Sequence, residues 1–283
     1  METIRDPGKL REIIRAVKLG GVSVGFVPTM GSLHRGHLSL LEEARRHSDY
    51  VVLSIFVNPL QFGQGEDFDA YPRDLQGDLE KAGEAGCDLA FLPEAGKLYP
   101  EGFSTYVEVT GPVTETLCGL SRHGHFQGVT TVVCKLFHLV QPDRAYFGQK
   151  DAQQAVIIKK MVKDLSLDLQ IVVCPTVREE DGVAMSSRNK YLQPHEREAA
   201  RVLYRSLREG EAMILQGERS GPKVAEKIRQ AIARQNLVKI DYVAVVDSDS
   251  LQDLEVITGS ALLAVAVFIG KARLIDNLLV TCK

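Results

Sequence analysis

The feature that most constrains the fold is a repeated order: a short apolar run, a polar or glycine-containing cluster, and then an amphipathic segment. Apolar runs occupy residues 22–27, 50–57, 88–92, 144–147 and 170–173. The run at 50–57 is continuous and rich in β-branched residues, which is typical of a strand buried on both faces of a parallel sheet. The alternation therefore predicts an α/β fold with a doubly wound parallel sheet, whose ligands gather outside the carboxyl ends of the strands.

From residue 193 onward the pattern changes. An amphipathic segment at 194–216 and another at 221–235 indicate helices, and apolar runs at 239–246, 261–269 and 274–280 indicate strands. This order predicts a second, smaller α+β domain. No cluster of titratable groups stands out in it, so we expect it to cover a site, form a dimer contact or add stability.

The composition limits the classes of partner that the protein is expected to bind. The chain has 283 residues, 45% of them hydrophobic, and a formal net charge of −3. This charge provides no long-range attraction to nucleic acid or to an anionic membrane, so a phosphate ligand would be held by local geometry. The first ten residues carry Glu2 and Asp6 and no apolar core, and the longest apolar run is about half of a membrane span. We expect a cytoplasmic protein whose five scattered cysteines are reduced.

The polar cluster after residues 22–27 is the strongest candidate site. It contains Met30, Gly31, His34 and His37 and leads into an amphipathic segment. A glycine-containing turn between a strand and a helix is a candidate phosphate-binding loop. The positive end of the helix dipole disfavours protonated imidazoles, so the two histidines would act as neutral donors, with His37 best placed to give a proton. Two surface histidines near a turn are the alternative.

Further polar side chains follow the other predicted strands. Gln61 comes after the run at 50–57, and Lys150 follows a short strand and Gly148. Ser186, Ser187 and Arg188 place two hydroxyls and a guanidinium in consecutive positions, a suitable grip for phosphate. Solvated loop residues and helix caps are the alternatives here, as they are for Arg122 and His125 at the start of a later helix.

Taken together, these clusters resemble the pantothenate synthetase family. The resemblance runs from about residue 3 to the end of the chain and rests on five motifs: Pro28-Thr29-Met30-Gly31 with His34-x-Gly36-His37, residues 56–62 (Phe-Val-Asn-Pro-Leu-Gln-Phe), Tyr71-Pro72-Arg73, Gly148-Gln149-Lys150-Asp151 with Gln153-Gln154, and Met185-Ser186-Ser187-Arg188. His-x-Gly-His alone indicates only the wider nucleotidyltransferase superfamily. The combination is far more specific.

The resemblance implies a Rossmann-like ATP- and pantoate-binding domain at residues 1–176, a smaller domain at 177–283 and a homodimer. It also implies an AMP-forming acid–amine ligase that uses ATP and Mg²⁺. The enzyme would join (R)-pantoate to β-alanine through a pantoyl-adenylate, releasing pyrophosphate, AMP and pantothenate.

The resemblance also assigns roles to residues. His37, His34 and Lys150 would be catalytic, and Gln61 and Gln154 would hold pantoate, with Gln61 near the incoming amine. The ATP-binding residues would be Met30, Gly31, His34, His37, Gly148, Gln149, Lys150, Asp151, Val177, Met185, Ser186, Ser187 and Arg188.

Two positions depart from the family pattern. Gly77-Asp78 stands where two adjacent acidic residues are common, so an acidic metal contact there rests on Asp78 alone. Gln149 stands where glutamate is expected. We therefore expect Mg²⁺ to be held mainly by ATP phosphates and water.

Two other functions compete. A nucleotidyltransferase of the same superfamily would keep the nucleotide on its product and release no AMP. A non-catalytic nucleotide-sensing module would not need His37 or Lys150. The second domain and the two glutamine sites argue against the nucleotidyltransferase. The chain retains every residue that the ligase chemistry requires, which argues against the sensing module.

Overall fold

The computed structural model describes residues 1–282. The chain divides into two compact units. The first comprises Met1–Val109, Arg122–Gly148 and Ile157–Pro175, and the second comprises Thr110–Ser121, Gln149–Val156 and Thr176–Lys283. Two short segments that precede residue 176 thus belong to the second unit. The expected domain boundary at residues 176/177 stays a prediction.

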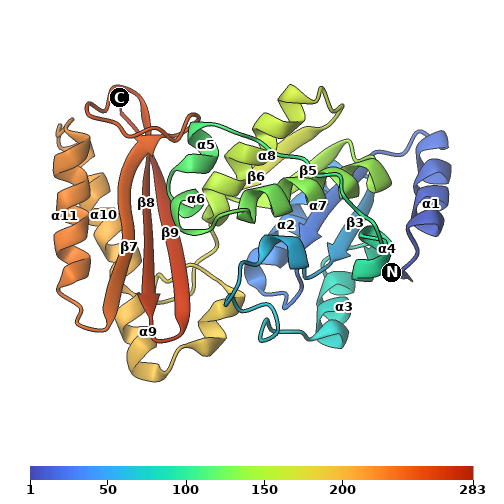
Figure 1. Cartoon of the computed structure of the whole chain (residues 1–283), viewed down its shortest axis with the longest axis horizontal. Helices are drawn as coiled ribbons and strands as arrows, with labels where there is room; N and C mark the ends of the chain where they lie inside the picture. Colours follow the sequence, from blue (N-terminus) through green and yellow to red (C-terminus); the bar gives the residue numbers. More distant parts are fainter. Residues whose placement is uncertain (283) are drawn as a thin grey trace. The chain divides into compact units, whose positions relative to one another are not determined.

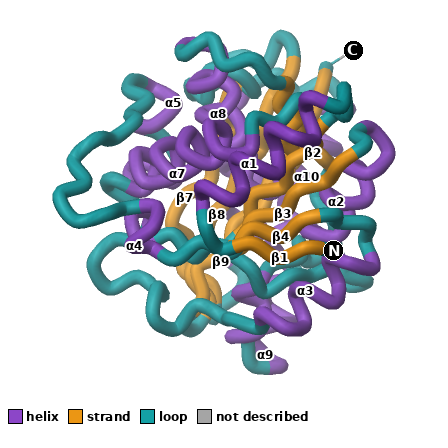
Figure 2. Tube along the Cα trace, turned by 90° about the vertical axis from the view of Figure 1, so that its right-hand side faces the viewer, coloured by secondary structure: helices purple, strands orange, loops and turns teal. Residues whose placement is uncertain are grey.

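A six-stranded parallel sheet forms the centre of the first unit (Figures 1 and 2). Its strand order is β1-β4-β3-β2-β5-β6, and every neighbouring pair is parallel. The strand bounds are β1 Glu2–Ile4, β2 Val24–Thr29, β3 Tyr50–Ile55, β4 Leu89–Phe91, β5 Arg144–Gly148 and β6 Gln170–Cys174. The predicted doubly wound α/β sheet is confirmed, and β1 is a strand that the apolar pattern did not predict.

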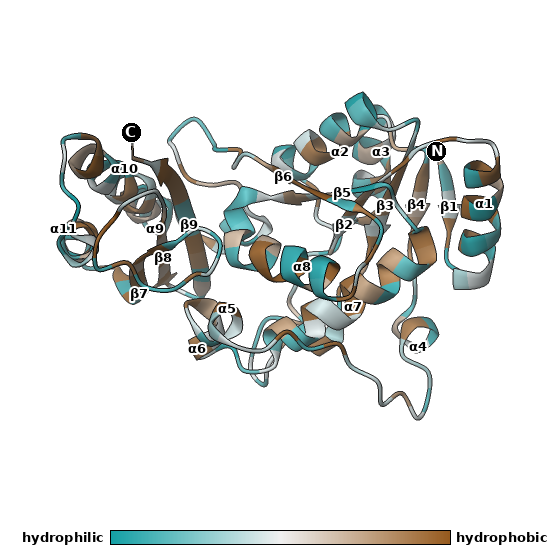
Figure 3. Ribbon diagram, turned by 90° about the horizontal axis from the view of Figure 1, so that it is seen from above, coloured by the Kyte–Doolittle hydropathy of each residue, from teal (hydrophilic) through white to brown (hydrophobic). Residues whose placement is uncertain are grey.

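Helices cover both faces of this sheet. Figure 3 shows α2 (Arg35–His47) and α3 (Leu75–Glu84) on one face, and α7 (His125–Val140) and α8 (Ala152–Asp164) on the other. Helix α1 (Pro7–Leu19) packs against α7. From β2 the chain winds outward through β3 to β4, whereas β5 and β6 extend the sheet in the opposite direction. The carboxyl ends of β2 and β5 therefore flank the switch point, where doubly wound sheets bind ligands.

The second unit contains a three-stranded antiparallel sheet in the order β7-β8-β9. Its strands are β7 Val238–Asp247, β8 Ser260–Ile269 and β9 Ala272–Thr281. Helices α10 (Val202–Leu215) and α11 (Gly221–Ala233) pack on this sheet, and β8 is mostly apolar and buried (Figure 3). The smaller α+β part of the fold prediction is confirmed.

The remaining elements are short. They are α4 Ala95–Leu98, α5 Pro112–Glu115, α6 Cys118–Ser121, α9 Pro194–Ala200 and the 3₁₀ turns η1 Pro59–Gln61, η2 Gln149–Asp151 and η3 Ser187–Tyr191. The single helix predicted for residues 194–216 is wrong, because the chain breaks at Arg201 between α9 and α10. Ala200 of α9 and Val202, Leu203, Leu207 and Ile214 of α10 belong to the apolar core of this unit.

All five cysteines are free thiols, and four of them are buried. Among residues 1–282, none of the helices combines the length and the apolar character that a membrane crossing requires.

Candidate active site

The loop after β2 is held by a buried carboxylate. Gly31 and Ser32 both adopt left-handed backbone conformations, with φ of 83° and 52°. Asp78 on α3 is 1% exposed, and its two oxygens accept the backbone N–H groups of Ser32 (2.7 Å) and Leu33 (2.6 Å). A Cβ at Gly31 would lie 3.0 Å from Asp78 Oδ2 and 3.0 Å from Ile55. The site therefore requires glycine at this position.

Thr29 ties the same loop to the sheet. Its hydroxyl donates to the carbonyl of Ser54 on β3 (2.8 Å) and accepts from the N–H of Gly31 (3.2 Å). The N–H groups of three consecutive residues, Gly31 to Leu33, thus already donate within the protein. A phosphate at this loop would therefore be met chiefly by side chains.

The two side chains at the start of α2 are those of His34 and His37, whose rings lie with their centroids 4.0 Å apart and tilted by 31°. His34 is the N-cap of α2, and its Nδ1 accepts from the N–H of Gly36 (3.2 Å). Nδ1 of His37 accepts from the N–H of His34 (3.3 Å). Because both Nδ1 atoms accept, the neutral form of each ring carries its proton on Nε2. The predicted pair of neutral donors fits this geometry.

Gln61 follows β3 and belongs to the same region of the first unit. It is 8% exposed, and its amide nitrogen lies 3.1 Å from the sulfur of Met30. Its Oε1 accepts from Nδ2 of Asn58 (3.1 Å), which also donates to the carbonyl of Gly128 (3.0 Å). Asn58 also caps η1 by accepting from the N–H of Leu60 (3.3 Å), so it is both a turn residue and a buried anchor. The amide N–H₂ of Gln61 faces Met30.

Arg122 and His125 act within the protein. Arg122 donates to both carboxylate oxygens of Glu66 (2.8 and 2.6 Å) and to Nε2 of His125 (2.8 Å). His125 Nδ1 lies 2.8 Å from the carbonyl oxygen of Gln61, which can only accept. Burial opposes ionisation of Glu66, but its hydrogen bond and charge interaction with Arg122 outweigh burial and lower its pKa. These contacts favour the loop-and-cap alternative for Arg122 and His125.

Lys150 lies in the second unit, on η2, immediately after β5 ends at Gly148. Its ammonium is 3.5 Å from the Asp151 carboxylate. The turn is fastened to β9 by Asn277, whose amide nitrogen donates to the carbonyl oxygens of Gln149 (2.9 Å) and Lys150 (2.9 Å). Sequence reasoning missed Asn277. The available signal was two adjacent polar residues, Asp276 and Asn277, inside an apolar strand.

The other predicted nucleotide contacts lie on a hairpin-like segment of the second unit. Val177 accepts from the N–H of Met185 (3.0 Å), and Ser186 caps η3 by accepting from the N–H of Arg188 (3.3 Å). Ser187 is buried. Lys150 and Ser186 line one small pocket together with Asn189 and Asp276. Within this unit the structure therefore brings the lysine and the serine segment together.

The paired glutamines at the start of α8 have different environments. Gln153 is buried, donates to the carbonyls of Val113 and Thr116, and accepts from the N–H of Cys118. Its amide is therefore used to hold the segment around residues 113–118. Gln154 is half-buried and is the one of the pair suited to a ligand.

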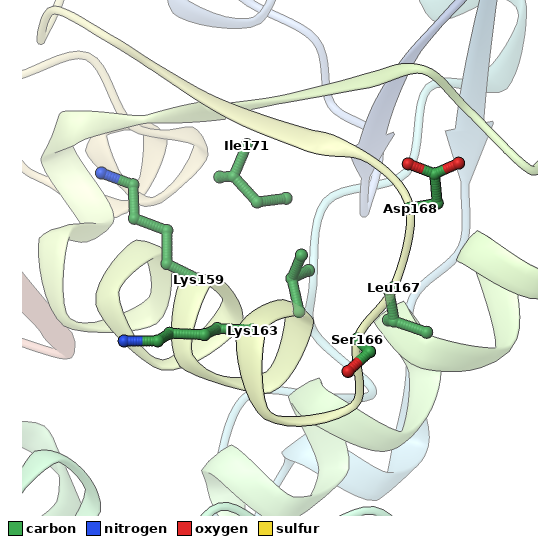
Figure 4. Close-up of a pocket in the computed structure, with 7 residues that line it drawn as sticks. Lys159, Lys163, Ser166, Leu167, Asp168 and Ile171 are labelled. Atoms are coloured by element: carbon green, nitrogen blue, oxygen red, sulfur yellow. The ribbon is translucent and has the colours of Figure 1, made fainter.

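A pocket of about 500 Å³ lies elsewhere in the first unit, between α8 and β6. Figure 4 shows Lys159 and Lys163 extending away from Asp168. It is open and contains none of the predicted site residues.

Comparison with known proteins agrees with these motifs. The family described as Pantoate-beta-alanine ligase matches residues 2–279. The chain is 55% identical to the pantothenate synthetase of Acetivibrio thermocellus over 99% of this chain and 98% of that one. It is 53% identical to that of Moorella thermoacetica, with 98% of each covered.

Solved structures agree too. The pantothenate synthetase of Thermus thermophilus superposes with a TM-score of 0.94 at 48% identity, covering 98% of this chain and 99% of that one. The pantoate-beta-alanine ligase of Francisella tularensis, complexed with beta-gamma ATP and beta-alanine, superposes with a TM-score of 0.80 at 35% identity, covering 99% and 97%. This chain belongs to the pantoate–β-alanine ligase family.

Proposed function

We propose that the protein joins pantoate to β-alanine at the expense of ATP, forming pantothenate, AMP and pyrophosphate through a pantoyl-adenylate. The observation that carries the proposal is the pair of imidazoles at the start of α2, whose Nδ1 atoms both accept backbone N–H groups. Gln61 lies in the same unit and follows β3, the strand next to β2. Donors fixed there suit charge that develops on phosphate oxygens.

In the first half-reaction a carboxylate oxygen of pantoate attacks the α-phosphorus of ATP, and pyrophosphate leaves. This step needs in-line positioning and charge neutralisation more than covalent catalysis. His37 would donate its Nε2–H to the developing charge, His34 would lie beside the phosphates, and Lys150 would neutralise them. The remaining nucleotide contacts would be Met30, Gly31, Gly148, Gln149, Asp151, Val177, Met185, Ser186, Ser187 and Arg188.

In the second half-reaction the amine of β-alanine attacks the acyl carbon, and the bond from that carbon to the AMP oxygen breaks. Gln61 and Gln154 would hold the pantoyl group. Because Oε1 of Gln61 already accepts from Asn58, the N–H₂ of Gln61 is the group that would donate to an acceptor on pantoate. The amine must arrive as a free base, so a proton is lost as the amide forms.

Magnesium would enter with ATP. Both oxygens of Asp78 already accept backbone N–H groups, and residues 1–282 contain no group of three His, Cys, Asp or Glu side chains that could hold a metal. The residues present do not fit a magnesium site of the protein's own. Phosphate oxygens and water would be the ligands, as Mg²⁺ prefers.

We also propose that the protein is a homodimer of the cytoplasm, with domains at 1–176 and 177–283. The resemblance to the family supports the dimer and the location. The last change of unit along the chain, between Pro175 and Thr176, supports the boundary.

Phosphorus NMR tests the function. Protein, ATP, Mg²⁺ and pantoate should give pyrophosphate in an amount equal to the enzyme, and β-alanine should then give AMP and pantothenate. Untouched ATP with folded protein would refute the ligase and favour a nucleotide sensor. A stable nucleotidyl product that ignores the amine would indicate an adenylyltransferase instead.

A further inference from the structure

We infer that Asn277 is a positioning residue for Lys150. The inference rests on the proposed role of Lys150 in adenylation. Asn277 lies on β9, 127 residues away in sequence, and is 5% exposed. Its Nδ2 donates to the carbonyl oxygens of Gln149 and Lys150, both at 2.9 Å, and its Oδ1 accepts from Nε2 of Gln149 at 3.0 Å. One amide thus makes three bonds to a turn of three residues.

The orientation of this amide is fixed by its partners. Backbone carbonyl oxygens can only accept, so both protons of Nδ2 must point at Gln149 and Lys150. If the amide were flipped, Oδ1 of Asn277 would face two carbonyl oxygens, and no hydrogen bond could form between them. These hydrogen bonds therefore require asparagine. Aspartate has the same shape, but it would place an acceptor oxygen where Nδ2 of Asn277 donates.

Asp276, the residue before Asn277, holds this part of strand β9 in place. Asp276 is 3% exposed and pairs with Arg178 through two hydrogen bonds of 2.7 and 3.0 Å, and it accepts the backbone N–H of Asn277 at 2.8 Å. Arg178 also donates to the carbonyl of Gly182 (3.1 Å) and stacks on Tyr204. The Asp276–Asn277 pair thus connects the lysine turn to the segment that leads to Met185.

The consequence for Lys150 follows from its side chain. A lysine ammonium is a point charge on a flexible stem, so where it can reach depends on where its backbone is held. Asn277 holds the carbonyl groups of Lys150 and of the residue before it. Loss of this hold would displace the ammonium without removing its charge, and a displacement of about 1 Å can cost about 100-fold in rate.

The test is a double-mutant cycle on the adenylation half-reaction, read as pyrophosphate released from labelled ATP in a single turnover without β-alanine. Asn277→Asp keeps the shape and reverses the polarity, and we expect a 10- to 100-fold slower release. In a Lys150→Ala background the same change should have no further effect. Asn236→Asp, the same substitution at an exposed position, should leave the rate unchanged.

Asn277→Ser, which retains one donor, keeps the test decisive if the aspartate variant does not fold. A folded variant with wild-type adenylation would overturn the inference, and so would an equal loss with and without Lys150, because that result indicates a general structural effect. If Lys150→Ala itself adenylates at the wild-type rate, the proposed role of Lys150 fails instead. The two failures are therefore distinguishable.

Discussion

The turn that carries His34 and the turn that carries Lys150 follow neighbouring parallel strands but are held in different ways. The first is held by residues close to it in the same unit: Gly31 and Ser32 in left-handed conformations, the reciprocal caps of His34 and His37, and Asp78 within the next 50 residues. The second is held by Asn277, at the far end of the chain.

This difference shows which parts of the site are shaped by the local sequence motif and which depend on distant residues. The histidine turn contains most of the groups that shape it, so its geometry follows from its sequence. The lysine turn depends on a strand that completes a separate antiparallel sheet. Its position therefore depends on the folding of the second unit.

The largest effect is expected at the histidine turn. His37→Ala should slow adenylation about 1000-fold, because removal of one fixed donor to developing charge typically costs 100- to 1000-fold. Single-turnover pyrophosphate release measures it, with circular dichroism to verify the fold. His195→Ala, at an exposed position on α9, is the matched control and should have no effect. A folded His37 variant with near-normal adenylation would remove the basis for the site.

Asp78→Asn tests the anchor of the same turn. An amide can accept from only one of the two N–H groups and presents N–H to the other, so one charged hydrogen bond is lost in a buried place. We expect the free energy of unfolding to fall by about 2 kcal/mol, together with weaker ATP binding. Chemical denaturation is the measurement. Asp168→Asn, which is exposed, serves as its control, and equal stability of the two variants would contradict the anchoring role.

The two glycines that begin the turns should respond differently to alanine. Gly31→Ala should cost about 1–2 kcal/mol of stability, because φ is 83° and the new Cβ would approach Asp78. Gly148 has no left-handed φ and no heavy atom within 4 Å of an added Cβ, so Gly148→Ala should unfold like the wild type. If Gly148 contacts the nucleotide, its variant should still show a raised KM for ATP. Equal destabilisation by both substitutions would contradict the inferred difference between Gly31 and Gly148.

The smallest effect concerns pH. The pKa of Glu66 is lowered in the folded state by Arg122, so its contribution to stability is present above the unfolded pKa and is lost as the pH falls through the folded pKa. Glu66→Gln should remove that acid-side loss, a change of about 1 kcal/mol or less. Urea unfolding between pH 3 and 7 measures it. A variant with the same pH dependence as the wild type would show that the pair contributes nothing.

Much of this could be predicted from the sequence. Apolar runs predicted β2 to β9 with small errors at their ends, because buried strands need continuous apolar residues. The strand β1 was missed because it has three residues, two of them exposed. Asp78 was a candidate metal contact, and the structure shows both of its oxygens accepting backbone N–H groups, a use that spacing cannot distinguish from metal contact. Two adjacent polar residues inside an apolar strand mark Asn277, but no local pattern reveals which remote segments Asn277 and Asn58 contact.

The most direct test of the central claim follows one oxygen atom. Pantoate labelled with ¹⁸O at both carboxylate oxygens is converted with ATP and β-alanine, and the AMP is analysed by mass spectrometry. Attack of the carboxylate on the α-phosphorus, then cleavage of the acyl carbon–oxygen bond, predicts one ¹⁸O in each AMP. AMP without label would contradict a pantoyl-adenylate intermediate.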